Sequence, residues 1–274
     1  MSTASLPTSL ILVGAGKMGG AMLQGWLSLG LAGKAVTVID PFAGDEMKAL
    51  CAKHGVALNP DAATIKAPQV LVLAIKPQML DEAAPGIAPL VGADTLVVSI
   101  LAGKTIGNIT ARLPARAVAR AMPNTPAAVG RGITGVAANA ATTPAQRAMA
   151  DALLQAIGQV VWVEDEVLID AVTAVSGSGP AYIFHMVEAM AAAGEAAGLP
   201  ADVALRLARA TVEGSGELLY REPATSAAQL RKNVTSPGGT TAAALEVLMG
   251  PEGLTELMSK AVAAAKRRAG ELSG

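Results

Sequence analysis

Short runs of consecutive apolar residues recur through the first half of the chain, and segments with a helical spacing of apolar residues separate them. Runs of this length without polar alternation are typical of strands that are buried on both faces of a sheet. The alternation of such strands with helices predicts a parallel sheet that helices cover on both faces. The expected strands lie at residues 10–13, 35–39, 70–75, 95–101, 117–121 and 133–137.

The pattern changes at the acidic stretch Glu164–Glu166, which we interpret as a solvated junction, and no strand is expected beyond it. The later apolar residues follow a helical period, and Gly and Pro interrupt them at positions typical of helix ends. Pro180 is expected in the first turn of a helix, where a proline removes no hydrogen bond. We therefore expect an α/β domain over residues 1–163 and an all-α domain over residues 164–274. The expected helices cover residues 182–197, 201–220, 226–233, 242–249 and 254–272.

A glycine motif, Gly14-x-Gly16-x-x-Gly19, follows the first expected strand directly and opens a helix. Such glycines permit a tight turn and a close approach of the backbone to a pyrophosphate, which the N–H groups of the helix N-terminus then bind. Asp40 ends the second expected strand, about 20 residues further on, where a carboxylate that binds the ribose is expected. The arrangement predicts dinucleotide binding, and the alternative is an ordinary glycine-rich turn.

Asp40 also bears on which nicotinamide cofactor binds. Its carboxylate would repel the 2′-phosphate of NADPH, and the following residues Pro41–Gly44 contain no Arg that would compensate. The local residues therefore favour NADH over NADPH. A Lys that is distant in the sequence, or a flexible loop, would reverse this preference, so both cofactors stay open.

Three further loops follow expected strands. Ala74–Gln78 and Ser99–Gly103 lie at the carboxyl ends of strands, where open α/β sheets bind ligands, and both are expected to line the nicotinamide side of a cleft. Lys76 has the alternative of an ordinary surface lysine. Arg120–Pro126 places Asn124 and Thr125 between two prolines, which predicts either a rigid loop that presents both side chains or a simple turn.

Two turns in the expected helical domain, Ser176–Pro180 and Ser236–Thr241, each precede a helix. Their hydroxyls and backbone N–H groups are suited to hold a carboxylate, although Ser and Thr also cap helices throughout proteins. Two glycines followed by two threonines exceed what a cap requires. A binding function is therefore favoured for Ser236–Thr241.

Composition excludes several classes of function. Twenty-one basic and 22 acidic residues give a net charge of −1 without long runs of one sign, so a nucleic-acid surface is not expected. One cysteine, Cys51, and two histidines are too few for a metal centre, and Cys51 is interpreted as a small buried residue. No uninterrupted apolar segment is long enough to span a membrane, and the apolar N-terminus lacks a basic leader, so a cytoplasmic protein is expected.

Together these segments resemble one family, pyrroline-5-carboxylate reductase, over nearly the whole chain. The resemblance rests on five stretches: GAGKMGGAM at 14–22, AIKPQ at 74–78, RAMPNTPA at 120–127, DAVTAVSGSGPAYIF at 170–184 and SPGGTT at 236–241. It implies reduction of 1-pyrroline-5-carboxylate to L-proline with NADPH or NADH. It also implies an α/β Rossmann domain followed by an all-α C-terminal dimerisation domain, in a homodimer or a higher homo-oligomer.

The resemblance also implies residue roles. The cofactor would contact the glycine turn, the end of the second strand, a residue after a third short strand, the two later loops and one residue of the helical domain. These are Gly14, Ala15, Gly16, Lys17, Met18, Gly19, Asp40, Asn59, Ala74, Ile75, Lys76, Pro77, Ile100, Leu101, Ala102 and Asn233. The substrate carboxylate would bind Ser236, Gly238, Gly239, Thr240 and Thr241.

Thr241 matches the family position proposed to donate or relay a proton to the substrate nitrogen. Protonation of a C=N nitrogen makes its carbon electrophilic, which favours hydride transfer. The substrate carries a basic nitrogen of its own, however, so positioning alone is the alternative source of catalysis. His185 has no evident carboxylate partner and is interpreted as a packed or surface histidine.

Two other functions have to be weighed. A β-hydroxyacid dehydrogenase shares the two-domain plan but uses a lysine on the first long helix of its helical domain, and residues 180–198 contain no Lys. A non-catalytic nucleotide-binding regulatory protein would need the glycine motif but would have no use for Ser236–Thr241. The reductase hypothesis further requires that the redox ring and the Ser236 turn meet in one crevice, within a subunit or across a pair.

Overall fold

The computed structural model describes residues 6–273, so the outermost limits of the two expected domains lie outside the described part. The backbone divides into two compact units, which are described separately. The first contains the residues up to Gly177 together with those from Lys266 onward, and the second contains Ser178–Ala265. This division differs from the expected boundary at residue 163, because residues 164–177 and the end of the last helix pack with the sheet.

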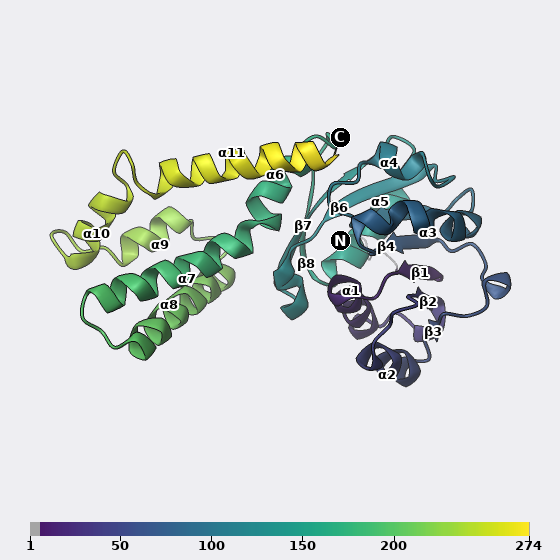
Figure 1. Cartoon of the computed structure of the whole chain (residues 1–274), viewed down its shortest axis with the longest axis horizontal. Helices are drawn as coiled ribbons and strands as arrows, with labels where there is room; N and C mark the ends of the chain where they lie inside the picture. Colours follow the sequence, from purple (N-terminus) through teal and green to yellow (C-terminus); the bar gives the residue numbers. More distant parts are fainter. Residues whose placement is uncertain (1–5, 274) are drawn as a thin grey trace. The chain divides into compact units, whose positions relative to one another are not determined.

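The first unit is built on one eight-stranded sheet with the order β3-β2-β1-β4-β5-β6-β7-β8 (Figure 1). All neighbouring strands are parallel except β6 and β7. The strands are β1 Leu10–Val13, β2 Val36–Ile39, β3 Ala57–Leu58, β4 Val70–Leu73, β5 Leu96–Ser99, β6 Ala117–Met122, β7 Gly132–Ala138 and β8 Gly158–Trp162. The helices are α1 Lys17–Ser28, α2 Asp45–His54, α3 Leu80–Ile87, α4 Ile106–Thr110, α5 Pro144–Gln155 and α6 Leu168–Val172.

Two features of the sheet depart from the expected one. The β6–β7 pair is antiparallel because a short loop joins these strands, whereas a parallel pair needs a crossover long enough to return along the sheet. The edge strand β8 was not expected. Gln159 and Val161 on it are exposed and alternate with half-buried residues, so it lacks the continuous apolar run of the inner strands.

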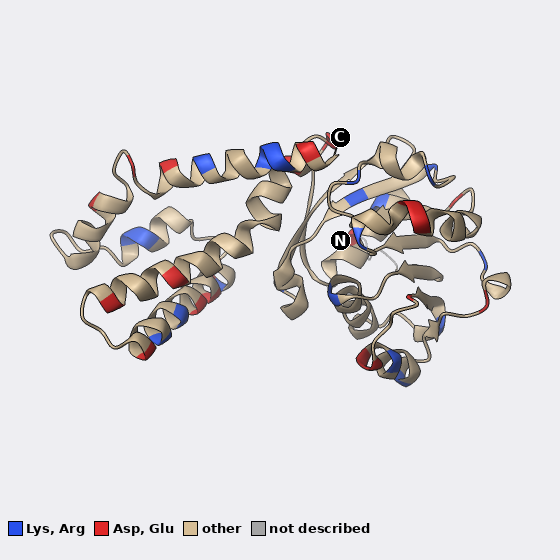
Figure 2. Cartoon of the chain, in the orientation of Figure 1, with Lys and Arg blue, Asp and Glu red and all other residues tan. Residues whose placement is uncertain are grey.

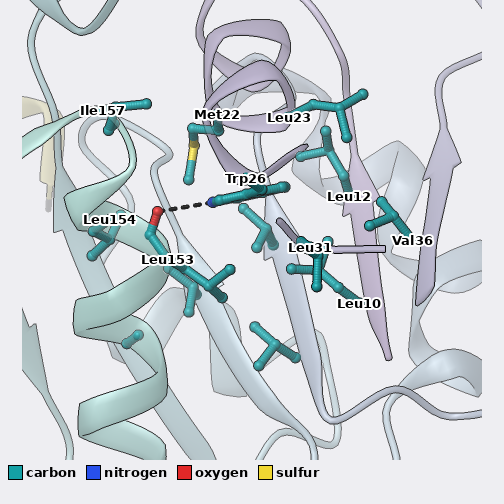
Figure 3. Packing of buried hydrophobic residues seen from close by; sticks show 14 of the residues in the cluster. Leu10, Leu12, Met22, Leu23, Trp26, Leu31, Val36, Leu153, Leu154 and Ile157 are labelled. Atoms are coloured by element: carbon teal, nitrogen blue, oxygen red, sulfur yellow. Dashed lines mark hydrogen bonds between the residues drawn. The ribbon is translucent and has the colours of Figure 1, made fainter. Parts of the chain in front are cut away.

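The inner strands are buried on both faces, as the apolar runs predict. On β1, Leu10 and Leu12 join one core cluster, while Ile11 and Val13 join a second cluster on the other face. The first cluster includes Trp26 of α1, and the side chain of Trp26 is fully buried. Its indole Nε1 donates a hydrogen bond of 2.8 Å to the carbonyl oxygen of Leu153 on α5 (Figure 3). Trp26 thus ties the helix that carries the glycine motif to the rest of the core.

The second unit is entirely helical among its described residues. Its helices are α7 Gly179–Ala196, α8 Ala201–Arg221, α9 Ala227–Asn233, α10 Thr240–Leu248 and the greater part of α11 Leu254–Ser273. Pro180 lies in the first turn of α7, as predicted. Small residues bring α7 and α8 together: a Cβ on Gly194 would lie 3.1 Å from the Cβ of Ala204.

This helical unit leaves many large apolar side chains exposed. Its buried apolar residues are the alanines Ala191, Ala204 and Ala208, whereas its longer apolar side chains are half-buried or exposed. Charged residues of both signs are interspersed along α8 (Figure 2), and two exposed pairs, Arg209–Glu213 and Arg221–Glu217, lie on it. Exposed large apolar side chains in this number are typical of a helical unit that forms a protein interface. The exposed residues include Ile183, Phe184, Leu205, Leu207, Leu218, Leu219, Val247, Leu248 and Leu257.

We predict that Trp26→Phe lowers the free energy of unfolding by about 1–3 kcal/mol, because the buried Leu153 carbonyl loses its partner. Urea denaturation measures the change. Trp162→Phe is the matched control: Nε1 of half-buried Trp162 donates to Asp151, whose carboxylate water can solvate in the variant. An equal loss in both variants would contradict the role given to Trp26.

Candidate cofactor-binding site

The turn between β1 and α1 has a shape that only glycine permits at two positions. Gly14 has a φ of 89°, and a Cβ there would lie 2.8 Å from the backbone of Ala74 at the end of β4. A Cβ on Gly19 would overlap the carbonyl oxygen of Gly14. These two glycines therefore let the turn, the helix and the end of β4 pack together.

Gly16 differs from its neighbours in the motif. It precedes the first residue of α1, and a Cβ built on it meets no protein atom within 4 Å. The N-terminus of α1 has no side-chain cap and no acidic residue in its first turn. Uncapped N–H groups and the positive end of the helix dipole together favour an anion. We call the open space at Gly16 the cradle, and it is suited to hold a pyrophosphate.

Asp40 follows β2 and is fixed by backbone groups on both sides. Its Oδ2 accepts the N–H of Ala15 at 2.8 Å, and its Oδ1 accepts the N–H of Phe42 at 2.9 Å. Asn59, with a φ of 47°, holds the Asp40 backbone by two hydrogen bonds of 2.8 Å. The side chain of Asn59 therefore positions Asp40.

Two neighbouring pockets run along the carboxyl edge of the sheet, at the point where the strand order reverses between β1 and β4. They have volumes of about 760 and 360 Å³ and share Gly16, Ala74, Ile75 and Lys76, so they form one trough. The larger pocket lies at the β2 side and contains Asp40. The smaller extends toward the ends of β5 and β6, where Ile100 and Met122 line it.

Most of the expected cofactor residues come together in this trough. The larger pocket holds Gly14, Gly16, Asp40, Ala74, Ile75 and Lys76, and the smaller adds Lys17, Met18, Pro77, Ile100 and Ala102. Ala15, Gly19 and Asn59 support the walls through the contacts given above, and the side chain of Leu101 is buried in the core. Whether each of these residues contacts a cofactor stays a prediction.

Several residues of the trough were missed in the sequence. α3 contributes Glu82, Ala83 and Gly86 to the larger pocket, and the turn after β2 contributes Phe42. Phe42 is 82% exposed, which is unusual for an aromatic residue, and its position beside Asp40 was the available signal. The sequence of α3 carries no such signal, because its residues come to line the same pocket as Asp40 only in the folded chain.

Two alternatives were expected for Arg120–Pro126, a rigid loop that presents its polar side chains or a simple turn. The structure does not support the first for Asn124, and Arg120–Met122 belong to strand β6. The side chain of Asn124 does not project into open space: its Nδ2 donates to the carbonyl oxygen of Ser176 at 3.1 Å, and its Oδ1 accepts the N–H of Ile133 at 3.0 Å. Asn124 therefore fixes neighbouring segments. Met122 and Pro123 from the same stretch line the smaller pocket.

The Ser236–Thr241 stretch lies in the helical unit: Ser236–Gly239 precede α10, which is nine residues long, and Thr240 and Thr241 are its first two residues. Gly238 has a φ of 68°, and the N–H of Gly239 donates to the carbonyl oxygen of Ser236 at 3.1 Å. A Cβ on Gly239 would lie 2.5 Å from the Ser236 Oγ. Gly239 is the cap residue of α10, and no side chain caps this N-terminus.

Three other residues were singled out in the sequence. Asn233 ends α9, and its carboxamide Oδ1 accepts a hydrogen bond of 2.7 Å from Gln229. His185 is exposed, as one interpretation held, but a carboxylate that was not anticipated, Glu188, lies 2.9 Å from its Nδ1. Cys51 is buried as predicted, and burial raises the pKa of its thiol. Among residues 6–273, no group of three or more His, Cys, Asp and Glu side chains is arranged to hold a metal ion.

Comparisons with known proteins identify the family. A family model described as pyrroline-5-carboxylate reductase dimerisation matches residues 166–272, and one described as NADP oxidoreductase, coenzyme F420-dependent, matches residues 9–103. The pyrroline-5-carboxylate reductase of Synechocystis sp. is 48% identical over 215 residues, which are 78% of each chain. The chain belongs to the pyrroline-5-carboxylate reductase family.

Solved structures agree with this membership. The pyrroline-5-carboxylate reductase of Coxiella burnetii has a TM-score of 0.89 at 35% identity and covers 97% of this chain and 99% of its own. The Plasmodium falciparum enzyme, solved with NADP bound, has the same fold with a TM-score of 0.78 at 24% identity and coverages of 97% and 98%. The Rossmann-like first unit and the helical dimerisation domain are thus those of the pyrroline-5-carboxylate reductase fold. The comparisons do not favour a β-hydroxyacid dehydrogenase.

Gly14 is packed against backbone and Gly16 faces open space, so replacing each by alanine is expected to affect a different property of the protein. Gly16→Ala should weaken NADH binding at least about tenfold without lowering stability, because its Cβ meets no protein atom but fills the cradle. Gly14→Ala should cost about 1–3 kcal/mol of stability, because its Cβ meets the Ala74 backbone. Fluorescence titration with NADH and urea denaturation give the two quantities. Wild-type affinity in Gly16→Ala would contradict the assignment of the cradle.

Proposed function

We propose that this chain catalyses the NAD(P)H-dependent reduction of 1-pyrroline-5-carboxylate to L-proline, the last step of proline biosynthesis. The observation that carries the proposal is the 48% identity to an enzyme of that name, in a chain whose trough has the features of a dinucleotide site. The proposal includes a homodimer or a higher homo-oligomer, which the dimerisation domain and the exposed apolar helices support. It also includes a cytoplasmic location. None of the described helices is both long and apolar enough to cross a membrane.

The residues of the trough fit a nicotinamide dinucleotide. The uncapped N-terminus of α1 and the space at Gly16 suit the pyrophosphate, and Asp40 suits the adenosine ribose. The nicotinamide half then falls to the smaller pocket, between Lys17, Ile100 and Met122. When bound, the dinucleotide supplies the hydride that reduces the imine carbon. The protein's own contribution is to hold and orient the reactants and to exclude water.

NADH is the proposed cofactor. Both carboxylate oxygens of Asp40 are held by backbone N–H groups, so the negative charge has a fixed place beside the ribose position. Of the described residues that line the larger pocket, only Lys76 is basic, and it lies on the wall shared with the smaller pocket. The 2′-phosphate of NADPH would meet a carboxylate there without a compensating cation.

We predict that purified protein oxidises NADH when 1-pyrroline-5-carboxylate is added, with a higher kcat/KM for NADH than for NADPH. Asp40→Ser should raise the NADPH-to-NADH ratio of kcat/KM about tenfold or more, because the repelling charge is removed. Asp45→Ser is the control, since Asp45 is an exposed carboxylate on α2 paired with Lys48. Absence of imine-dependent oxidation with either cofactor would refute the proposed activity, and an unchanged ratio would refute the role of Asp40.

The Ser236–Thr241 turn is the proposed site for the substrate carboxylate. The uncapped N-terminus of α10 offers backbone N–H groups, and Ser236, Thr240 and Thr241 offer hydroxyls. The positive φ of Gly238 and the tight contact at Gly239 give the turn a fixed form. Asn233, which ends the preceding helix, is proposed as a cofactor contact. The reaction requires this turn, from the same chain or from a second copy, to present the imine to the nicotinamide.

Thr241 is proposed to hold or relay a proton at the substrate nitrogen. We predict that Thr241→Ala lowers kcat about 10- to 100-fold and leaves the Kd for NADH unchanged, whereas Thr241→Ser, which keeps the hydroxyl, retains most of the activity. Steady-state rates and NADH titration measure both effects. If Thr241→Ala turns over as fast as the wild type, positioning alone accounts for catalysis.

A further inference from the structure

Arg120 is a buried cation inside the first unit, on strand β6. Its side chain is nearly inaccessible, with the whole residue 5% exposed. Its Nη1 lies 3.1 Å from Glu166 Oε1, and its Nη2 lies 3.5 Å from Asp170 Oδ1 and 3.4 Å from the Ser273 hydroxyl. The acidic stretch at Glu164–Glu166 is therefore not simply a solvated junction, because Glu166 turns inward to this guanidinium.

The partners of Arg120 come from the two segments through which the chain passes between its units. Glu166 and Asp170 lie on the segment that leaves the first unit at Gly177, and Ser273 lies on the segment that returns at Lys266. The two segments also bind each other, since the Ser273 hydroxyl lies 3.3 Å from Asp170 Oδ1. Figure 1 shows the end of α11 beside α6. Both connecting segments thus contact the guanidinium of Arg120.

The outgoing segment is fixed again just before it leaves the unit. Asn124, four residues beyond Arg120 on the same stretch, binds the carbonyl oxygen of Ser176. A Cβ on Gly177 would lie 2.8 Å from the Met122 side chain, so the backbone passes close to the end of β6. Glu166 is fixed in turn by the N–H of Ile106 at 2.7 Å. These contacts fix the outgoing segment, up to Gly177, within the first unit.

Stability alone is a weak reason for this cluster. Arg120 is almost wholly removed from water and the two carboxylates are partly removed, which is costly, and buried ion pairs often add little net stability over apolar side chains of similar size. What such a cluster does fix is geometry, because the planar guanidinium binds its acceptors in set directions. The function of Arg120 is therefore to be sought in what it positions.

We propose that Arg120 is a positioning residue for the reduction, acting through the two connecting segments. The inference rests on the proposed function, in which the substrate turn belongs to the helical unit and the cofactor cradle to the first. Reactive geometry requires the two carbons to approach within about 3–3.5 Å, and a misplacement of about 1 Å costs on the order of 100-fold in rate. Fixing both connections at one point supplies that precision, whether the reacting partners belong to one chain or to two.

The test compares three forms of the full-length protein. Arg120→Lys keeps the charge but cannot reach all three acceptors at once. A second variant, Arg120→Met/Glu166→Gln/Asp170→Asn, removes the buried charges together and leaves no carboxylate unpaired. The control is Arg112→Lys, which alters an ion pair with Asp81 in the same unit and leaves the partners of Arg120 unchanged. For each form, kcat, the two KM values, the Kd for NADH, the Tm and the molecular mass in solution are measured.

We expect both Arg120 variants to lose about 10- to 100-fold in kcat, with a Kd for NADH within about twofold of the wild type. NADH affinity is preserved because Arg120, Glu166, Asp170 and Ser273 are absent from the linings of both pockets. The Arg112→Lys control should keep its kcat.

Three results would overturn the inference: a lowered Tm with wild-type kcat, a Kd for NADH that weakens in proportion to kcat, or failure of both Arg120 variants to fold. Each would assign Arg120 to stability or to the cofactor site instead. Wild-type protein assayed alongside separates these results from a failure of the proposed function, which would show as no imine reduction in any form.

Discussion

The close approach of the Gly14 turn to the end of β4 is the constraint on which the nucleotide-binding unit depends. Gly14 can sit against the Ala74 backbone only because it lacks a Cβ and adopts a φ of 89°. Gly19 then allows α1 to begin directly over the Gly14 carbonyl. With α1 in this place, its uncapped N-terminus faces the trough, and the N–H of Ala15 reaches Asp40. One backbone contact thus sets together the proposed pyrophosphate cradle at Gly16 and Asp40, the carboxylate proposed to bind the ribose.

The two units differ in the size of the apolar side chains that they bury. The sheet buries large apolar residues on both faces and has a complete core around Trp26 (Figure 3). The helical unit buries only alanines and exposes leucines, valines and Phe184. Small residues let α7 and α8 pack closely, but they contribute little buried area, so the larger apolar side chains remain for another surface. This division agrees with a dimerisation domain that completes its core against a second copy.

The sequence predicted the parts of the molecule that local physics determines. β1, β4 and β5 appear as apolar runs because both of their faces are buried, and the spacing of Gly14, Gly16 and Gly19 is dictated by a single turn. Prediction failed where the structure depends on contacts between distant segments. Strand β8 was not predicted, because it has an exposed face and no continuous apolar run. Glu166 looked solvated because its partner, Arg120, lies 46 residues earlier in the chain. The sequence left open whether Asn124 is presented or is part of a simple turn, because Ser176 and Ile133, which bind it, come together only in the fold.

The central claim is that the carboxyl edge of the sheet, from Asp40 to Ala102, binds the nicotinamide dinucleotide. Hydrogen–deuterium exchange with and without saturating NADH tests it most directly, because the backbone N–H groups of the turn would become hydrogen-bonded or shielded on binding. The account predicts slower exchange in peptides that cover residues 14–20, 39–43 and 74–79, with little change in β8, the edge strand remote from the trough. Unchanged exchange in those three segments at saturating NADH would contradict the claim.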